Sequence, residues 1–328
     1  MKTFNQALQR ATMASAMALM IAGGAAQAQD KPAPNKPAPA PAGAPAPPAG
    51  PAAKAQTPEE ARRAESETAF EAAAKASTQG PADVPLTNQA VMKLPAGYAF
   101  VPRAEGDRLM RSFGNRSGAN FLGLVLPMDG ANWIVTLDYN KAGYVRDDDA
   151  KVWKADELLK TLQEGTESAN EDRATRGFPP IEISGWVEPP AYQSDTHRLV
   201  WAANVRRKGE TAGGSVNYNT YALGREGYFE LNMVGPGEAI VKDKGRAQEL
   251  LAALNYVPGK GYGDFQVGTD KVAEYGLAAL VAGVAAKKLG MFALAAVFLA
   301  KMGKLALVAI FGVFAVISRL FKRKPPAA

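Results

Sequence analysis

The sequence predicts an α+β domain, with an antiparallel sheet flanked by a few helices, followed by a C-terminal transmembrane helix. Short alternating apolar runs follow one another with tight turns between them, and helical patterns interrupt these runs at only a few places. The chain after residue 270 is strongly apolar and carries basic residues. Regular alternation of strand and helix is missing, which argues against a doubly wound parallel sheet.

Residues 1–28 have the three parts of a secretory signal peptide. Lys2 and Arg10 supply the positive start, residues 11–22 form a short apolar run, and Ala26-Gln27-Ala28 is a small-residue site, so we expect cleavage after Ala28. An uncleaved anchor is the alternative, although the run is short for a spanning helix. Residues 29–56 are rich in proline and alanine and predict a disordered linker, because proline removes the backbone donor and fixes φ.

Residues 57–78 predict an exposed helix that acts as a tether, with Thr57 as its cap and Pro58 at its first position. A periplasmic α+β domain is expected over residues 82–268. Its predicted strands are 89–94, 98–102, 121–126, 133–139, 181–187, 197–206, 215–223 and 228–233, and its predicted helices are 104–113, 155–173 and 238–255. Turns are expected at 94–97, 127–130 and 224–227, and the last two are predicted to be hairpin turns between paired strands.

Residues 270–324 predict a membrane-associated helical region. Its cleanest apolar run, 305–320, is shorter than the ~20 residues that span a bilayer, but flanking basic side chains can reach the interfaces, so we expect one span near 303–321. A helix lying in the interface and a re-entrant hairpin are alternatives, and the position of residues 275–300 is left open. The basic tail predicts a single-pass protein of the bacterial inner membrane, with a periplasmic domain and a cytoplasmic C-terminus.

The net charge of +6 belongs to the two ends of the chain. Residues 1–10 contribute +2 and residues 271–328 contribute +8, which leaves −4 for residues 11–270. A mildly acidic body is a poor phosphate binder, so we expect no nucleic-acid partner. The expected partners are the inner membrane and an unidentified envelope protein or polymer.

The composition excludes several kinds of chemistry. The chain has no cysteine and one histidine, which removes cysteine nucleophiles, iron–sulfur clusters and the usual zinc sites. Walker A, GxGxxG and GxSxG motifs are also missing. We therefore expect no cofactor.

Three carboxylates stand in a row at Asp147-Asp148-Asp149. Alternate side chains of an extended segment point opposite ways, so Asp147 and Asp149 are the two that can share a face and bind a divalent cation. Capping of the following helix is the alternative.

Two segments ten residues apart carry the candidates for catalysis. Glu188 and His197 come close if the strands that hold them pair as a hairpin, and a carboxylate can orient a histidine for base work. A structural hydrogen bond is the alternative for this pair. Trp186 and Trp201, on the same strands, are interpreted as core or interface anchors.

The segment 217–221, which includes Tyr218 and Asn219, and Arg225 carry polar groups on or beside predicted strands. If one face of the sheet is open, they can line a groove for a peptide or glycan. A solvated sheet face is the alternative.

Several of these segments also resemble a family catalogued only as a domain of unknown function in membrane-anchored prokaryotic proteins. The resemblance runs from about residue 114 to 288. Its most specific pieces are Gly143-Tyr144-Val145-Arg146-Asp147-Asp148-Asp149-Ala150 and Gly185-Trp186-Val187-Glu188-Pro189-Pro190. It implies an exported domain anchored by its C-terminal helix, and it assigns no activity or site residue.

Two hypotheses of function follow. The first is a non-enzymatic binding or scaffolding module of the cell envelope, anchored on the membrane. The second is a periplasmic hydrolase or metal-dependent enzyme that uses Glu188, His197 and Asp147/Asp149. The missing nucleophile motif and metal spacing favour the first, although enzymatic activity stays open.

Overall fold

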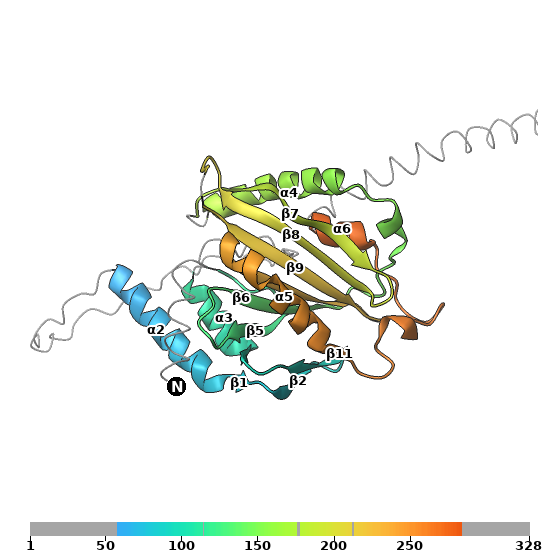
Figure 1. The fold of residues 1–328 in the computed structure, drawn as a ribbon, viewed down its shortest axis with the longest axis horizontal. Helices are drawn as coiled ribbons and strands as arrows, with labels where there is room; N and C mark the ends of the chain where they lie inside the picture. Colours follow the sequence, from blue (N-terminus) through green and yellow to red (C-terminus); the bar gives the residue numbers. More distant parts are fainter. Residues whose placement is uncertain (1–57, 114, 176–177, 212, 284–328) are drawn as a thin grey trace, which may run out of the picture.

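The computed structural model describes residues 58–113, 115–175, 178–211 and 213–283. It confirms an α+β fold with a large antiparallel sheet and few helices (Figure 1). Eight strands form the large sheet in the order β1-β4-β5-β6-β10-β9-β8-β7. These strands are β1 (Thr78–Gln79), β4 (Tyr98–Pro102), β5 (Phe121–Pro127), β6 (Ile134–Asn140), β7 (Ile181–Gln193), β8 (Arg198–Arg207), β9 (Ser215–Leu223) and β10 (Tyr228–Pro236).

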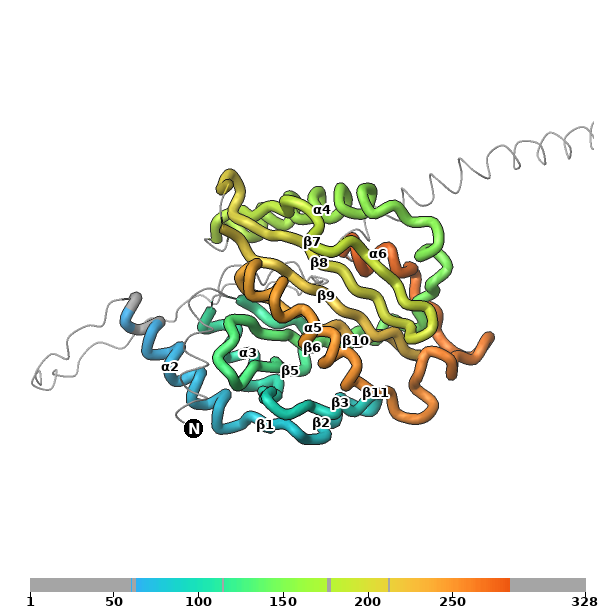
Figure 2. The backbone as a smooth tube through the Cα atoms, in the orientation of Figure 1, coloured from blue at the N-terminus to red at the C-terminus, as the bar shows by residue number. Residues whose placement is uncertain are grey.

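One face of the large sheet is covered by helix α5 (Gly237–Ala253) and a small sheet. The small sheet has the order β11-β3-β2, with β2 (Ala82–Leu86), β3 (Ala90–Leu94) and β11 (Leu254–Tyr256). Figure 2 shows how α5 runs directly into β11 at the small sheet. Buried side chains such as Met92, Phe229 and Leu250 fill the space between these layers. This face is therefore an apolar core.

The opposite face is covered at its two ends. Helices α2 (Pro58–Ala76) and α3 (Arg103–Ser112) pack on β4 and β5, and α4 (Ala155–Thr175) and α6 (Leu277–Ala282) belong to the apolar cluster at the β7–β8 end. The alanines Ala69 and Ala73 of α2 are fully buried. The predicted tether thus packs on the domain, because its small side chains form an apolar face that a count of large apolar residues overlooks.

Both predicted hairpin turns join paired strands. Residues 127–130 connect β5 to β6, and residues 224–227 connect β9 to β10. Residues 94–97 also form the expected turn between two strands, but β3 pairs with β2 and β11, while β4 pairs with β1 and β5, so this turn carries the chain from the small sheet to the large one.

Strand β7 is longer than predicted and lies at the edge of the large sheet. It continues through Pro189 and Pro190 and pairs with β8 as a hairpin whose register shifts at three places. Proline is tolerated there because an edge strand has an unpaired side that needs no donor.

Residues 270–283 pack on the domain. The backbone of Gly143 and Tyr144 meets residues 271–273, where Tyr144 and Val272 form a parallel bridge. Gly143 has φ +96°, and a Cβ on it would lie 2.6 Å from the Lys271 carbonyl oxygen, so this approach requires glycine. Leu277 and Val281 of α6 are fully buried. This part of the predicted membrane-associated region therefore belongs to the core.

The described residues contain no helix with the length and apolarity that a membrane span requires. The predicted signal peptide (1–28), the linker (29–56) and the span near 303–321 lie outside the described residues.

Candidate functional site

The centre of the second sheet face carries a block of polar side chains, between the area covered by α2 and α3 and the area covered by α4 and α6. Strand register defines it. Asp138, Glu230 and Tyr221 lie opposite one another across β6, β10 and β9, and Thr136, Asn232 and Asn219 form the next row on the same face. We call these six residues, together with Asn217 one step further along β9, the polar block.

Apolar side chains border the polar block along β5 and β8 and at one end of β6 and β10. Its neighbours in the same register are Phe121 and Leu124 on β5, Ile134 on β6, Val234 on β10, and Leu199, Trp201 and Ala203 on β8. All seven are buried. A cluster of polar groups set into an apolar surround is costly unless its hydrogen bonds are made.

Two asparagines of the polar block lack hydrogen bonds. Asn232 is 0% exposed and Asn217 is 2% exposed, and both the nitrogen and the oxygen of each amide have no partner. Asn219 is better satisfied, because its amide nitrogen donates to the Asn217 carbonyl oxygen at 3.2 Å. Unpaired buried amides cost free energy in the folded state, so a functional reason is expected for them.

The two carboxyl groups of the polar block have unusual electrostatics. Burial raises the pKa of the Asp138 carboxyl to about 7, although the charge of Arg103 acts in the opposite direction. Burial and the neighbouring Asp138 charge raise the pKa of Glu230 to about 8, while a hydrogen bond from Tyr221 lowers it. The Tyr221 hydroxyl lies 3.3 Å from Glu230 Oε1 and 3.2 Å from the Leu280 carbonyl oxygen.

The β9 residues of the polar block belong to the segment 217–221 that was predicted to line a groove, but those of β6 and β10 were not predicted. The missed signal is polar residues at every second position of these two strands, 136 and 138, 230 and 232. Such alternation also describes a solvated sheet face, but every residue of β9 is buried here. The prediction of an open face for β9 is therefore wrong.

The other residues of the predicted groove lie elsewhere. Tyr218 points to the α5 side of the sheet, where its hydroxyl contacts Gln248 and Glu188 at 3.1 and 3.4 Å. Trp201 is buried beside the polar block and meets Trp186 edge to face, with ring centroids 5.7 Å apart. The Trp186 indole donates to the Ala155 carbonyl oxygen. Both tryptophans thus lie in the packing between the sheet and the start of α4.

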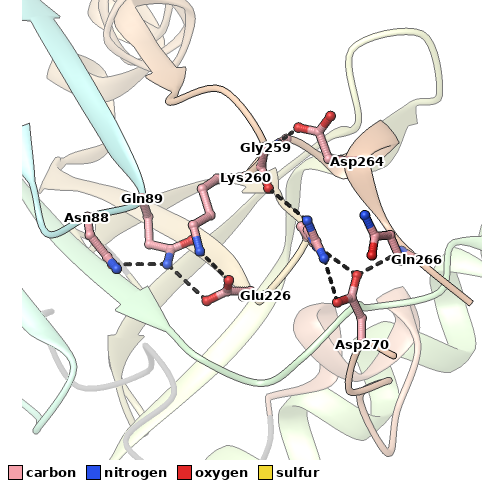
Figure 3. A network of polar contacts seen from close by, with 10 residues as sticks. Asn88, Gln89, Glu226, Gly259, Lys260, Asp264, Gln266 and Asp270 are labelled. Atoms are coloured by element: carbon pink, nitrogen blue, oxygen red, sulfur yellow. Dashed lines mark hydrogen bonds and ion pairs between the residues drawn. The ribbon is translucent and has the colours of Figure 1, made fainter. Parts of the chain in front are cut away.

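Arg225 belongs to a network that closes the β9–β10 turn. Its guanidinium forms two hydrogen bonds with the Asp270 carboxylate, at 2.7 and 2.8 Å, and a third with the Gly259 carbonyl oxygen. In Figure 3 the adjacent Glu226 lies between Gln89 and Lys260, and hydrogen bonds with both lower its pKa. This network joins the turn to the loop after β11, which is a structural role.

The residues of the catalytic hypothesis do not converge. β7 and β8 pair as expected, but Glu188 lies opposite Ala202, well before the turn that holds His197. Glu188 accepts a hydrogen bond from Lys244 of α5 at 3.2 Å. His197 Nδ1 instead lies 3.2 Å from the Tyr192 hydroxyl.

A different carboxylate reaches His197 indirectly. The Tyr192 hydroxyl donates to Asp147 Oδ2 at 2.8 Å and so stands between Asp147 and His197. The His197 ring packs on Tyr262, which in turn stacks on Tyr144. Because its rings stack and its polar groups are hydrogen-bonded, this cluster holds the β7–β8 turn in place and has a structural role.

Asp149 has turned away from Asp147. Its two carboxylate oxygens accept the backbone N–H groups of Leu277 and Ala278, at 3.0 and 2.9 Å, and so cap α6. The described residues hold no group of three or more histidine, cysteine, aspartate or glutamate side chains arranged to bind a metal. The structure thus does not bring Asp147 and Asp149 together.

The fold and the polar block define an α+β protein with a buried polar site on its central strands. The chain belongs to the family described as "Protein of unknown function (DUF2167)", whose model matches residues 78–311. This confirms the resemblance to a family of unknown function.

Comparisons with other proteins add little. Curated proteins give no match. Among solved structures, the chain is similar to the solution structure of cyanobacterial PsbP (CyanoP) from Synechocystis sp. PCC 6803, with 5% identity and a TM-score of 0.33 over 55% of this chain and 91% of that one. A likeness of this degree carries no argument about fold or function.

Proposed function

We propose that the protein is an exported, membrane-anchored module of the bacterial inner membrane that binds a small polar or ionic ligand at the polar block. The observation that carries the binding site is the pair of buried asparagines, Asn217 and Asn232, whose amide groups have no partner. A ligand that supplies those hydrogen bonds offsets the free-energy cost of burying the two unpaired amides.

Export and anchoring rest on the two ends of the sequence. The signal-like segment at 1–28 and the apolar, basic segment that includes 303–321 flank the domain. An acidic body between basic ends is in keeping with an exported domain on a membrane.

A small ligand suits the site better than a protein or polymer. Asn232, Thr136 and Glu230 are at most 6% exposed, so they offer no broad contact surface. Extended partners need an open groove or face, and Tyr218 and Asn219, two of the residues predicted to line one, are buried in the described part of the sheet.

The hydrolase hypothesis is not carried forward. Its four residues occupy three separate places: Glu188 on the α5 side, Asp149 at the start of α6, and Asp147 with His197 at the β7–β8 turn. A general base needs to be within hydrogen-bond reach of a nucleophile, and the described residues around His197 supply no activated one.

Native mass spectrometry of the full chain, purified in detergent from its own membranes, tests the proposal. We expect a bound species on the wild-type protein that is lost in Asn232→Ala. The matched control is Asn255→Ala on β11, where Asn255 is exposed and its side chain donates to the Ala253 carbonyl oxygen. The proposal is contradicted if wild type and Asn232→Ala carry the same amount of bound species, or if wild type carries none.

A further inference from the structure

Four oxygen-bearing side chains of the polar block stand at the corners of a small rectangle. Asp138 lies directly opposite Glu230, and Thr136 directly opposite Asn232, on neighbouring strands and on one face. Opposite Cβ atoms in an antiparallel pair are about 5 Å apart, and successive residues on one face are about 7 Å apart. The centre of such a rectangle is within reach of all four side chains.

The two carboxyl groups at this place are not held in ion pairs. Among the described residues, the positive charge that acts on Asp138 is that of Arg103, and no basic side chain acts on Glu230. The Arg103 guanidinium interacts with Asp138 through its charge, but it donates its hydrogen bonds to the backbone carbonyl oxygens of Ala119 and Phe121. Two neighbouring carboxylates in an apolar surround favour a positive ligand.

Asn232 provides an independent indication. Its side chain is fully buried next to Glu230 on the same face, and its amide oxygen has no donor. An amide oxygen without a donor is a ready ligand for a hard cation, as are the two carboxylates and the Thr136 hydroxyl.

We infer that the polar block binds a divalent cation of the hard, oxygen-preferring class, held by Asp138, Glu230 and Asn232 with Thr136 beside them. The inference rests on the proposed function, because it names the ligand class of the same site. Carboxylate and amide oxygens from a sheet face suit Ca²⁺, which accepts six to eight ligands in flexible geometry, better than Mg²⁺, which demands an octahedron. Zinc is disfavoured because the chain has no cysteine and its one histidine lies at the β7–β8 turn.

The test uses the full chain in detergent, stripped with chelator and titrated with CaCl₂ while thermal unfolding is followed. A ligand that binds only the folded state raises Tm in proportion to the logarithm of its concentration once it exceeds Kd. We expect this rise for wild type, and a shift of its onset to at least tenfold higher Ca²⁺ in Glu230→Gln and in Asp138→Asn.

Both variants keep the shape of the side chain and remove a buried charge, so each is expected to fold. The matched control is Asp83→Asn, which removes an exposed carboxylate paired with Lys93 on the small sheet. It should respond to Ca²⁺ as wild type does.

Three results overturn the inference: no Ca²⁺ response of wild type up to millimolar concentration, an unchanged response in Glu230→Gln and Asp138→Asn, or an equal loss in Asp83→Asn. A response to MgCl₂ at lower concentration than CaCl₂ overturns the preference for Ca²⁺. An organic species in the mass spectra together with no Ca²⁺ response leaves the proposed function standing and removes this inference alone.

Discussion

Trp201 and His197 lie four residues apart and have very different surroundings. Trp201 is 3% exposed and packs against Trp186 in the core. His197 occupies the turn between β7 and β8 with φ +53°, a left-handed conformation that costs free energy for a residue with a side chain. The imidazole of His197 forms a hydrogen bond with the Tyr192 hydroxyl and packs on the ring of Tyr262. These differences predict different costs of truncation.

Trp201→Ala is expected to lower the free energy of unfolding by about 3–5 kcal/mol, because it leaves a large cavity in a packed interior. His197→Ala should cost only about 0.5–1.5 kcal/mol, the usual value of one hydrogen bond. Urea unfolding of both variants measures the difference. A fully stable His197→Ala protein that has lost its cellular function contradicts the structural role of this histidine.

The carboxyls of the polar block predict a pH dependence in the absence of metal. Their folded-state pKa values, about 7 for Asp138 and about 8 for Glu230, lie above the ordinary values of 3.8 and 4.5. Between about pH 4 and 8 the folded state therefore binds more protons than the unfolded state, and stability falls as pH rises through this window.

We expect a higher Tm at pH 5.5 than at pH 8.5 in the presence of chelator. Glu230→Gln should flatten this dependence and raise Tm at pH 8.5, because the amide carries no charge to bury. Thermal unfolding at both pH values is the measurement, with Asp83→Asn as a control that keeps the wild-type slope.

At the scale of elements, α6 depends on a cap that comes from far along the chain. Asp149 lies in the short turn of residues 148–151 and accepts the first free N–H groups of a helix that begins at Leu277. A helix of six residues has little stability of its own, so capping and burial hold it.

Asp149→Ala is expected to destabilise the domain by about 0.5–2 kcal/mol, the usual cost of losing a cap. Gly276→Ala should have the same direction, because a Cβ there would lie 2.5 Å from Asp149 Oδ2. Hydrogen exchange of residues 277–282 measures the local effect. Asp148→Ala, which removes an exposed carboxylate, is the control and should match wild type.

The elements themselves could be predicted well where the pattern was local. The bounds of β4 and β9 agree with the predicted ranges, since apolar alternation and flanking turns mark both. The separation of β3 from β4 could not be predicted, because a tight turn is compatible with either a hairpin or a change of sheet. Only the packing of α5 under the small sheet decides between them.

At the scale of the whole molecule, the polar block depends on strand order and register, which cannot be predicted from this sequence alone. Asp138 and Glu230 are ninety-two positions apart and become neighbours only because β10 inserts between β6 and β9. The same applies to Asp149, which caps a helix instead of meeting Asp147. The sequence shows which residues have polar or acidic side chains, but only strand order and register show which of them are neighbours in the fold.

Membrane topology is also a property of the whole chain. A reporter active only in the cytoplasm should be active when fused after Ala328. It should be silent when it replaces residues 284–328, a boundary chosen to keep α6 intact. Activity measurements on both fusions in bacterial cells give the answer, and the reverse pattern contradicts the single-pass orientation.

The irregular edge of the large sheet bears on how copies of this protein behave when crowded. An exposed strand normally offers a template on which another chain can polymerise. Here one edge is β1, two residues long, and the other is β7, which carries two prolines without donors and three breaks in register. Neither edge can guide a neighbour into a continuous ladder. Molecules concentrated on one surface, as we propose for this protein, can therefore diffuse past one another without seeding fibrils.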